Sequence, residues 1–573
     1  MTFTEWLLFF LGVQLVHFFG TWKLYQRAGR KPWEALIPIY NGFVLMEIIK
    51  RPRWWILLLF IPIVNLLMFP IIWIETARSF GFVERKYTLL TLITFGLFAY
   101  YINYATEAPY RKDRKLDPRT PLGEWVSSIA FAIIAATMVH TYFMQPYTIP
   151  SSSLEKTLLV GDYLFVSKFH YGARVPMTTV AAPMLHDTLP IINKKSYLYE
   201  DDMEKRDQAL VNKLQLPYMR LPGFQKIKRN DIVVFSWPAD TVHQFFQRPD
   251  TRIRKPIDKR SNYVKRCVGV PGDSLSVVGG FVYINGTQTV LPDRAKLQFY
   301  HTIYSKKGLS TRELKEYSEK EFQREYIANF TSNQQIKAVN PYGALERIEG
   351  NKFKISTSYQ GIPREVILAY NIDITESKTK VRLANLTVKI AEDLRKNPAV
   401  DSVIRNIQSK GIYSGLFPQS REYKWTQNNF GPIYIPEAGK TVAINAQTIP
   451  FYKKIIDEYE HNDLLVDGKD VYINGQKAES YTFKQDYYWM MGDNRDNSED
   501  SRTWGYVPFN HVVGKPVMVW FSWDTETGSI RWDRMFTTVG GNGELVSYRY
   551  VVFALILAYI GYSVFRSRRK KKA

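Results

Sequence analysis

The chain has 573 residues, a formal net charge of +22 and one cysteine, Cys267. This length suffices for two or more domains together with membrane spans, and a single cysteine excludes an intramolecular disulfide framework. The positive charge is compatible with nucleic acid or with anionic lipid, and we favour lipid because the basic residues cluster beside apolar runs without any nucleic-acid-binding motif.

Five apolar runs are long enough, or nearly long enough, to cross a hydrocarbon layer, which takes about 20 helical residues. They are Trp6–Gly20, Trp54–Ala77, Thr88–Ala105, Trp125–Phe143 and Tyr548–Phe565. Lysine and arginine gather in the loops at 22–53 and 105–124 and in the C-terminal tail. The positive-inside rule places all three in the cytoplasm, so five crossings put the N-terminus and residues 145–546 outside.

The fourth predicted span is followed at once by Ser151-Ser-Ser-Leu-Glu-Lys-Thr-Leu158. Three serines after a proline are most often an ordinary polar turn. A serine acts as a nucleophile only where a base lies within hydrogen-bond reach. This segment alone therefore leaves both interpretations open.

The region beyond this segment is predicted to be mainly β structure. Strand-like runs occur at Tyr163–Val166, Ile232–Trp237, Tyr263–Val270, Phe281–Ile284, Tyr488–Met491 and Val517–Trp523. Lys265 lies inside the third run, where alternation puts it on the same face as Cys267 and opposite Arg266. A lysine on an apolar face is costly, but the pattern alone also permits a solvent-facing lysine.

A short echo, Val-Tyr-Ile-Asn-Gly, occurs at 282–286 and again at 471–475. Asn-Gly is typical of a tight hairpin turn, so each copy predicts a β-hairpin. We interpret residues 287–470 as an α/β insertion or as part of a duplicated hairpin unit. The elements predicted there are helices at Thr311–Ala328 and at Val388–Lys396, the second capped by Thr387, and a strand at Val400–Ile404.

The densest polar run is Gly492-Asp-Asn-Arg-Asp-Asn-Ser-Glu-Asp-Ser-Arg502, which lies between two strand-like runs. A solvated loop rarely concentrates aspartate, asparagine, arginine and serine in this way. The run therefore predicts a hydrogen-bonded structure built around a partner.

Together, the three segments around Ser153, Lys265 and Ser498 resemble the conserved boxes of bacterial type I signal peptidases. These are membrane-bound Ser/Lys endopeptidases that remove signal peptides from exported preproteins. The lysine box, Lys265-Arg-Cys-Val-Gly-Val-Pro-Gly-Asp273, and the closing box, 492–502, match the family pattern at every specified position. The serine box matches more loosely, because Ser152, Leu154 and Lys156 stand where the family has glycine, methionine and proline.

The resemblance implies a role for each aligned residue. Ser153 would be the nucleophile and neutral Lys265 the general base, and the hydroxyl of Ser151 with the backbone N–H of Ser153 would form the oxyanion hole. Ser498 would orient Lys265. Two further residues, Asp500 and Arg502, would form a structural clamp. We assign a structural role in this loop, and no catalytic one, to Asp493, Asn494, Arg495 and Asp496.

A neutral lysine base requires a lowered pKa, because free lysine titrates near ~10.4, and burial against apolar groups is the expected cause. Histidine is the usual base, but none of the eight histidines sits in a comparable motif. A Cys267 nucleophile is a weaker alternative, since no histidine partner stands near it in the sequence.

We therefore expect a multi-pass α-helical membrane anchor and a mainly-β extracytoplasmic catalytic domain of signal-peptidase type with an α/β insertion. The expected segments are an N-terminal membrane region (1–123), a membrane anchor (124–144), the catalytic domain in two parts (145–286 and 471–546), the insertion (287–470), and a C-terminal span with a basic tail (547–573).

The expected function is removal of signal peptides by a Ser-Lys acyl-enzyme mechanism at the outer face of a bacterial cytoplasmic membrane. Expected partners are exported preproteins and anionic lipids, with no nucleic acid, metal or cofactor. The alternative function is a catalytically inactive relative that serves as a membrane scaffold. A soluble self-cleaving regulator is disfavoured by the five predicted spans and by the absence of a DNA-binding motif.

Overall fold

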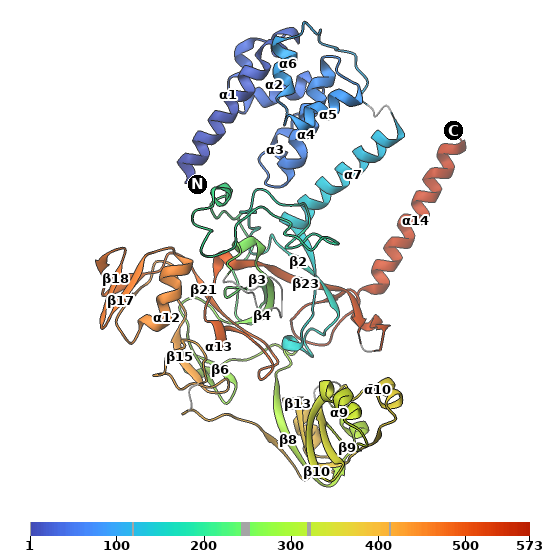
Figure 1. The fold of residues 1–573 in the computed structure, drawn as a ribbon, viewed down its shortest axis with the longest axis vertical. Coiled ribbons are helices and arrows are strands. Elements are labelled where there is room, and N and C mark those ends of the chain that lie inside the picture. Colours follow the sequence, from blue (N-terminus) through green and yellow to red (C-terminus); the bar gives the residue numbers. More distant parts are fainter. Residues whose placement is uncertain are drawn as a thin grey trace.

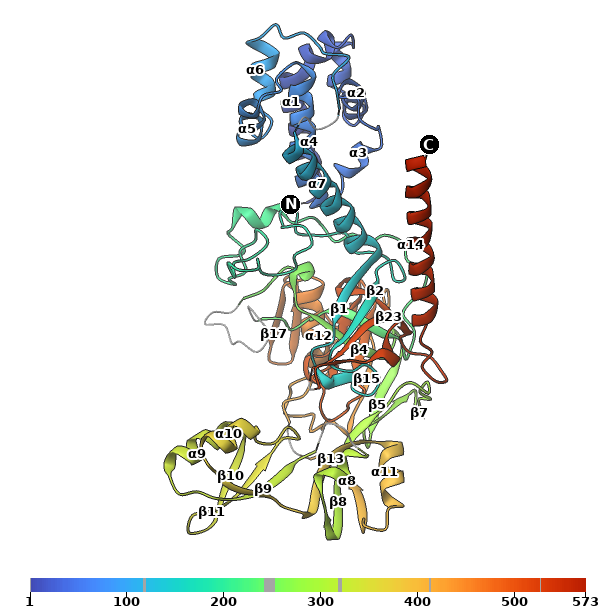
Figure 2. The same cartoon turned by 90° about the vertical axis from the view of Figure 1, so that its right-hand side faces the viewer.

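The structure is a computed structural model that describes residues 2–116, 120–241, 253–317, 322–411, 414–525 and 527–572. A helical bundle, a β domain and an α/β lobe follow one another along the long axis of the molecule (Figures 1 and 2). Helix α7 (Pro121–Met138) runs from the bundle to the β domain, and helix α14 (Arg549–Lys572) leaves the β domain in the direction of the bundle.

Three helices within the described residues are long and apolar enough to cross a membrane. They are α1 (Phe3–Arg27), the segment Pro121–Phe143 that contains α7, and Arg549–Arg568 within α14. These helices match the first, fourth and fifth of the predicted spans. Helix α1 begins in a capping box, in which the Thr2 side chain and Glu5 satisfy each other's backbone N–H groups.

The second and third predicted spans are not continuous helices. Residues 54–77 divide into α3 (Trp55–Leu58) and α4 (Val64–Ser79), and residues 88–105 fall into α5 (Arg85–Ile93) and α6 (Phe98–Tyr104). Pro62, which has no N–H to continue a helix, lies in the first break, and Gly96 in the second has a φ of 83°. Together with α2 (Tyr40–Ile48), these short helices pack on α1 around the buried side chain of Tyr25.

The β domain is built on one antiparallel sheet, in the order β1-β2-β23-β3-β4-β21-β22. Its strands are β1 (Met144–Thr148), β2 (Asp162–Ser167), β3 (Ile232–Ser236), β4 (Asn262–Gly269), β21 (Tyr487–Met491), β22 (Val507–Pro508) and β23 (Val512–Asp524). Two short strands, β24 (Ser529–Ile530) and β25 (Thr537–Thr538), pair with β23. The predicted mainly-β domain is thereby confirmed.

Alternate residues of β3 fill two apolar cores on the two faces of this sheet. Val233 and Phe235 enter one core, and Ile232 and Val234 enter the other. All five residues of β3 are buried. A strand with no solvent face reads as a continuous apolar run, and this explains the Ile-Val-Val-Phe sequence.

Both Asn-Gly hairpins predicted from the sequence echo are present. The first joins β6 (Phe281–Ile284) to β7 (Thr287–Gln288), and the second joins β18 (Asp470–Ile473) to β19 (Gln476–Lys477). Asn285 and Gly286 have φ of 51° and 82°, and the corresponding angles at Asn474 and Gly475 are 52° and 76°. Two successive positive φ values define the hairpin turn that Asn-Gly favours. Each hairpin extends an earlier strand, β5 (Ser274–Val278) or β17 (Leu464–Asp467).

The α/β lobe contains two small sheets, with strand orders β13-β8-β14 and β10-β11-β9-β12. The strands are β8 (Gln298–Leu309), β9 (Arg324–Asn329), β10 (Gly343–Glu349), β11 (Lys352–Thr357), β12 (Asp373–Glu376), β13 (Thr379–Thr387) and β14 (Ser402–Arg405). The helices are α8 (Thr311–Lys315), α9 (Asn333–Val339), α10 (Arg364–Ala369) and α11 (Val388–Arg395). The chain then returns, and β15 (Phe430–Tyr434) pairs with β5.

The sequence predictions for this lobe are confirmed in two cases and wrong in one. Helix α11 forms, with the Thr387 side chain accepting from the N–H of Ile390, and β14 forms after Pro398. The predicted helix at 311–328 ends after its first turns, because residues 324–329 pair with both β11 and β12. Pairing on both sides outweighs a local helical pattern.

Candidate active site

Ser153 lies in a one-turn 3-10 helix, Ser152–Leu154, which follows edge strand β1. The turn is anchored by Leu154 and Leu158, both buried in the core beneath it. Lys156 has a φ of 66°. A proline is fixed near −65° and cannot adopt this angle. The chain's serine turn therefore has a conformation that the proline of the family pattern would forbid.

Lys265, on strand β4, reaches the hydroxyl of Ser153. Its Nζ donates to Ser153 Oγ at 2.5 Å, although 112 residues separate the two in sequence. The lysine is 2% exposed, and its Nζ lies 5.3 Å from the centre of the Tyr263 ring. The solvent-facing lysine that the strand pattern also allowed is thus excluded, and the two residues form a close pair.

Burial lowers the pKa of Lys265 to about 8, while the carboxylates of Asp500 and Glu499 act in the opposite direction. Desolvation destabilises the ammonium form, and a nearby negative charge stabilises it. About a tenth of such a lysine is neutral at pH 7. The site therefore holds a serine hydroxyl against an amine that can accept a proton near neutral pH.

Asp500 and Arg502 form a fully buried, bidentate ion pair. Arg502 Nε and Nη2 donate to the two carboxylate oxygens of Asp500, each at 2.8 Å, and the exposed fractions of the two side chains are 1% and 0%. Burial alone would raise the pKa of Asp500, but the Arg502 charge and its hydrogen bonds lower it. Asp500 also accepts from the N–H of Gly492, and Arg502 donates to the carbonyl of Arg495. The pair thus ties the two ends of the closing box together.

The same loop holds the backbone of the serine turn. The N–H of Asn494 donates to the carbonyl of Ser153, and its Nδ2 donates to the carbonyl of Ser152, both at 3.1 Å. Asn497 Nδ2 donates to Ser152 Oγ at 2.9 Å. Asn494 thus fixes the peptide units on either side of Ser153, and Asn497 holds the side chain of the neighbouring Ser152.

Arg266 and Thr157 are two contributors that sequence reasoning did not identify. Arg266 Nε and Nη2 donate to the carboxylate of Asp493 at 2.7 and 2.6 Å, and Thr157 Oγ1 donates to the same group at 2.7 Å. These contacts join the lysine box, the serine box and the closing box through one buried carboxylate. The position of Arg266 next to Lys265 in the lysine box is the sequence feature that could have identified Arg266 as part of the site.

Ser498 lies beside the dyad without the predicted bond to Lys265. Its Oγ is buried and has no hydrogen-bond partner among the described residues. Gly492 lies between Ser498 and Ser153, since a Cβ at Gly492 would approach Ser498 Oγ and lie 2.5 Å from the Ser153 carbonyl oxygen. Glycine is therefore required at 492 by close approach, and the role of Ser498 stays a prediction.

Ser151 and Cys267 occupy contrasting environments. Ser151 is exposed, in an extended conformation, directly before the serine turn. Cys267 is buried in the core beneath the sheet, and burial raises the pKa of its thiol. A thiol that resists ionisation is a poor nucleophile, which argues further against the cysteine alternative.

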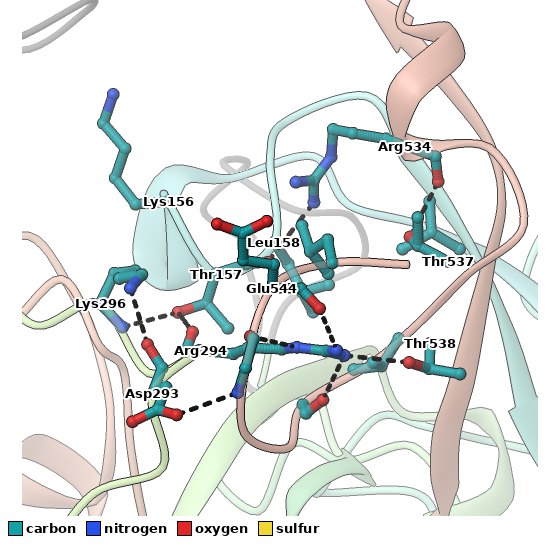
Figure 3. A pocket seen from close by; sticks show the side chains of 15 residues that line it. Lys156, Thr157, Leu158, Asp293, Arg294, Lys296, Arg534, Thr537, Thr538 and Glu544 are labelled. Carbon is teal, nitrogen blue, oxygen red and sulfur yellow. Dashed lines mark hydrogen bonds between the residues drawn. The ribbon is translucent and has the colours of Figure 1, made fainter. Parts of the chain in front are cut away.

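A pocket of about 410 Å³ adjoins the end of the serine box and is lined by Thr157, Leu158, Arg294, Arg534 and residues 537–540 and 543–545 among others. Figure 3 shows Arg294 extended beneath it, with its guanidinium bonded to Thr538 Oγ1 and to the carbonyls of Gly540 and Glu544. Its lining includes neither Ser153 nor Lys265. Arg294 thereby ties the segment that precedes α14 to the β domain.

The electrostatic surroundings of Lys265 predict a change in pH dependence for Glu499→Gln. Glu499 is exposed and accepts from the Tyr263 hydroxyl at 3.2 Å. Because its charge raises the pKa of Lys265, removing that charge should lower this pKa and leave more neutral amine below pH 8. We expect the reactivity of the Ser153 hydroxyl at pH 7 to rise by about twofold.

A pH profile of kcat/KM checks this expectation, because its acid limb reports the essential base of the free enzyme. The limb should move to lower pH in Glu499→Gln and stay in place in Glu422→Gln, a change at an exposed glutamate outside the lysine's surroundings. A limb that stays in place or moves to higher pH in Glu499→Gln would contradict the assignment of Lys265 as the titrating base.

Comparison with known proteins gives the family. The family described as "Signal peptidase, peptidase S26" matches residues 122–341 and 435–523, more than half of the chain, and these segments contain all three boxes. Residues 33–113, in the bundle, match a family of unknown function (DUF5684).

Curated relatives named "Signal peptidase I" share the similarity. The protein of Buchnera aphidicola subsp. Schizaphis graminum is 23% identical over 70% of this chain and 75% of its own length. That of Rickettsia rickettsii is 26% identical over 29% of this chain and 44% of its own length. That of Helicobacter pylori is 37% identical over 13% of this chain and 31% of its own length. The chain belongs to the signal peptidase family, peptidase S26, as a relative of the type I enzymes.

Proposed function

We propose that this protein is a membrane-bound serine endopeptidase that removes N-terminal signal peptides from exported preproteins. Family membership supports a peptidase that processes signal peptides. The observation that carries the catalytic proposal is the 2.5 Å contact between Lys265 Nζ and Ser153 Oγ. A buried lysine with a pKa near 8, held against a serine, is a nucleophile and base pair that needs no histidine.

In the proposed reaction, Ser153 Oγ attacks the scissile carbonyl carbon while neutral Lys265 takes the hydroxyl proton. The C–N bond of the tetrahedral intermediate then breaks, and the lysine ammonium gives its proton to the departing amine. This leaves the signal peptide as an acyl ester on Ser153 and restores neutral Lys265. A water molecule then attacks the ester, with Lys265 again accepting the proton and returning it to Ser153 Oγ.

The oxyanion of each tetrahedral intermediate requires donors that are already in place. We assign the backbone N–H of Ser153 and the hydroxyl of Ser151 to this task. The exposed position of Ser151 leaves its hydroxyl able to turn toward a bound carbonyl. The buried Ser498 hydroxyl is assigned to orienting Lys265 once the lysine has released Ser153 to its substrate.

We further propose that α1, α7 and α14 cross a bacterial cytoplasmic membrane with the β domain on its outer side. The C-terminal ends of α1 and α14 and the N-terminal end of α7 lie on the side away from the β domain (Figure 1). Basic residues follow α1, precede α7 and end α14. Positive charge on one side favours the cytoplasmic side and contact with anionic lipids.

Cleavage of a model preprotein by the detergent-solubilised full chain tests the proposal. Wild type should release a mature product whose new N-terminus, read by Edman degradation, lies directly after the signal peptide. Ser153→Ala should leave the preprotein intact. If the wild type also leaves it intact under conditions where it is folded, the chain is instead the inactive scaffold.

A further inference from the structure

Asn385 reaches the catalytic box from outside the family match. It lies in the unmatched stretch 342–434, on strand β13 of the α/β lobe. Its Nδ2 donates to Asn494 Oδ1 at 2.5 Å, and the side chains of Asn385 and Asn494 are 1% and 0% exposed. A residue of the lobe thus touches, at a fully buried contact, the asparagine that holds the serine turn.

The contact is one member of a seam between the lobe and the closing box. The N–H of Gln298, the first residue of β8, donates to the carbonyl of Asp493, and the N–H of Arg495 donates back to the carbonyl of Gln298, both at 3.0 Å. The N–H of Tyr300 donates to Asp496 Oδ2 at 2.9 Å. Asn385 is the β13 residue that pairs with Tyr300. The lobe therefore meets the box along a short, specific stretch of both β8 and β13.

Alternation along β13 turns Asn385 toward this seam. Its neighbours Ala384 and Leu386 are buried in the lobe's own apolar core, so the asparagine lies on the opposite face of the strand. A buried amide is costly unless it is hydrogen-bonded. An asparagine at this position is accounted for by its bond to Asn494.

We propose that Asn385 is a positioning residue of the peptidase and that the α/β lobe thereby controls the placement of Ser153. The inference rests on the function proposed above. The hydrogen bond from Asn385 orients the Asn494 side-chain amide so that its Nδ2 faces the Ser152 carbonyl. The backbone N–H of the same Asn494 donates to the Ser153 carbonyl. Without the Asn385 bond, the Asn494 side-chain amide loses one of the bonds that fix its orientation, and its hold on the serine turn weakens.

Loss of the Asn385 bond should slow the chemical step and leave substrate binding intact. A misplacement of about 1 Å at a nucleophile costs on the order of a hundredfold in rate. We expect kcat for preprotein cleavage to fall by about 10- to 100-fold in Asn385→Ala, with KM nearly unchanged. Asn385→Leu, which keeps the branched shape of the side chain but has no donor, should behave in the same way.

Asn406→Ala is the matched control. Asn406 belongs to the same lobe, and its Oδ1 accepts from Thr302 Oγ1 at 2.9 Å, but it is exposed and bonded within the lobe. This variant should cleave at the wild-type rate. Comparable loss in Asn406→Ala and Asn385→Ala would mean that the lobe acts only through its stability, and it would overturn the inference.

A double-mutant cycle separates positioning from a structural role. If Asn385 acts through Asn494, Asn385→Ala should cost little when Asn494 is already alanine, so the two effects should be strongly non-additive. Additive losses would overturn the inference. So would wild-type kcat in both Asn385→Ala and Asn385→Leu.

Acylation of Ser153 by p-nitrophenyl acetate keeps this test distinct from that of the proposed function. In this reaction Ser153 Oγ forms an ester with the acetyl group, p-nitrophenolate leaves, and Lys265 takes the hydroxyl proton. Mass spectrometry of the peptide that contains Ser153 measures the rate. Should wild type fail to cut preproteins, slower acylation in Asn385→Ala than in wild type still supports the inference. Equal rates, or no acylation in either protein, overturn it.

Discussion

Ser153→Ala and Lys265→Met are each expected to lower the rate of preprotein cleavage by about 10⁴-fold or more, and the double variant should be no slower than either single one. Neither side chain can form the acyl-enzyme alone, because the Ser153 hydroxyl needs a base to take its proton and Lys265, 2.5 Å away, needs that hydroxyl as the nucleophile. Methionine keeps the length and the apolar contacts of the lysine stem. Its loss of activity would therefore report the amine and not the packing.

Lys168→Met is the control for this experiment. Lys168 is a half-buried lysine that follows β2, and burial lowers the pKa of this residue to about 7. Its Nζ lies over the Tyr147 ring at 5.8 Å. Lys168→Met should retain activity and an acid limb near pH 8. If Lys265→Met stays active, or if the limb disappears in Lys168→Met, Lys265 is not the base.

The sequence was sufficient to identify the candidate catalytic residues because each of their motifs is contiguous. The lysine and closing boxes name Lys265, Asp500 and Arg502 directly, and the apolar alternation around Lys265 gives strand β4 within one residue. What alternation could not give is the exposure of the lysine, since both faces of this sheet are buried. Period-two patterning distinguishes inside from outside only when one face meets water.

The contacts missed by sequence reasoning join residues that are distant along the chain. Asn385 and Asn494 are 109 residues apart, and Thr157 and Asp493 are 336 apart. No local propensity encodes such a pair. The predictions of continuous helices at 54–77, 88–105 and 311–328 differ from the structure for a related reason. Breaks in the chain interrupt the first two helices, and strand pairing outweighs the helical pattern in the third. The sequence showed that Lys156 stands where the family pattern has proline, but it could not show the positive φ that the turn adopts there.

Breaking the buried pair of Arg266 and Asp493 should cause a large loss of stability. The pair is 1% and 0% exposed, and Asp493 also accepts from Thr157. Arg266→Met leaves this carboxylate buried without its cation, which typically costs about 3–5 kcal/mol. We expect the midpoint of thermal unfolding of the β domain to fall by about 10 °C.

A second bidentate pair provides the matched control, because it has similar geometry but more water. Arg324 donates twice to Glu376 at 2.8 Å within the α/β lobe, where the two side chains are 20% and 28% exposed. Solvent screens this pair, and its loss in Arg324→Met should cost about 1 kcal/mol or less. If the two variants lose equal stability, burial is not what makes the Arg266 pair essential. A partial recovery in the double variant Arg266→Met/Asp493→Leu would identify the stranded charge as the cause of the loss, since replacing both partners removes the unpaired carboxylate.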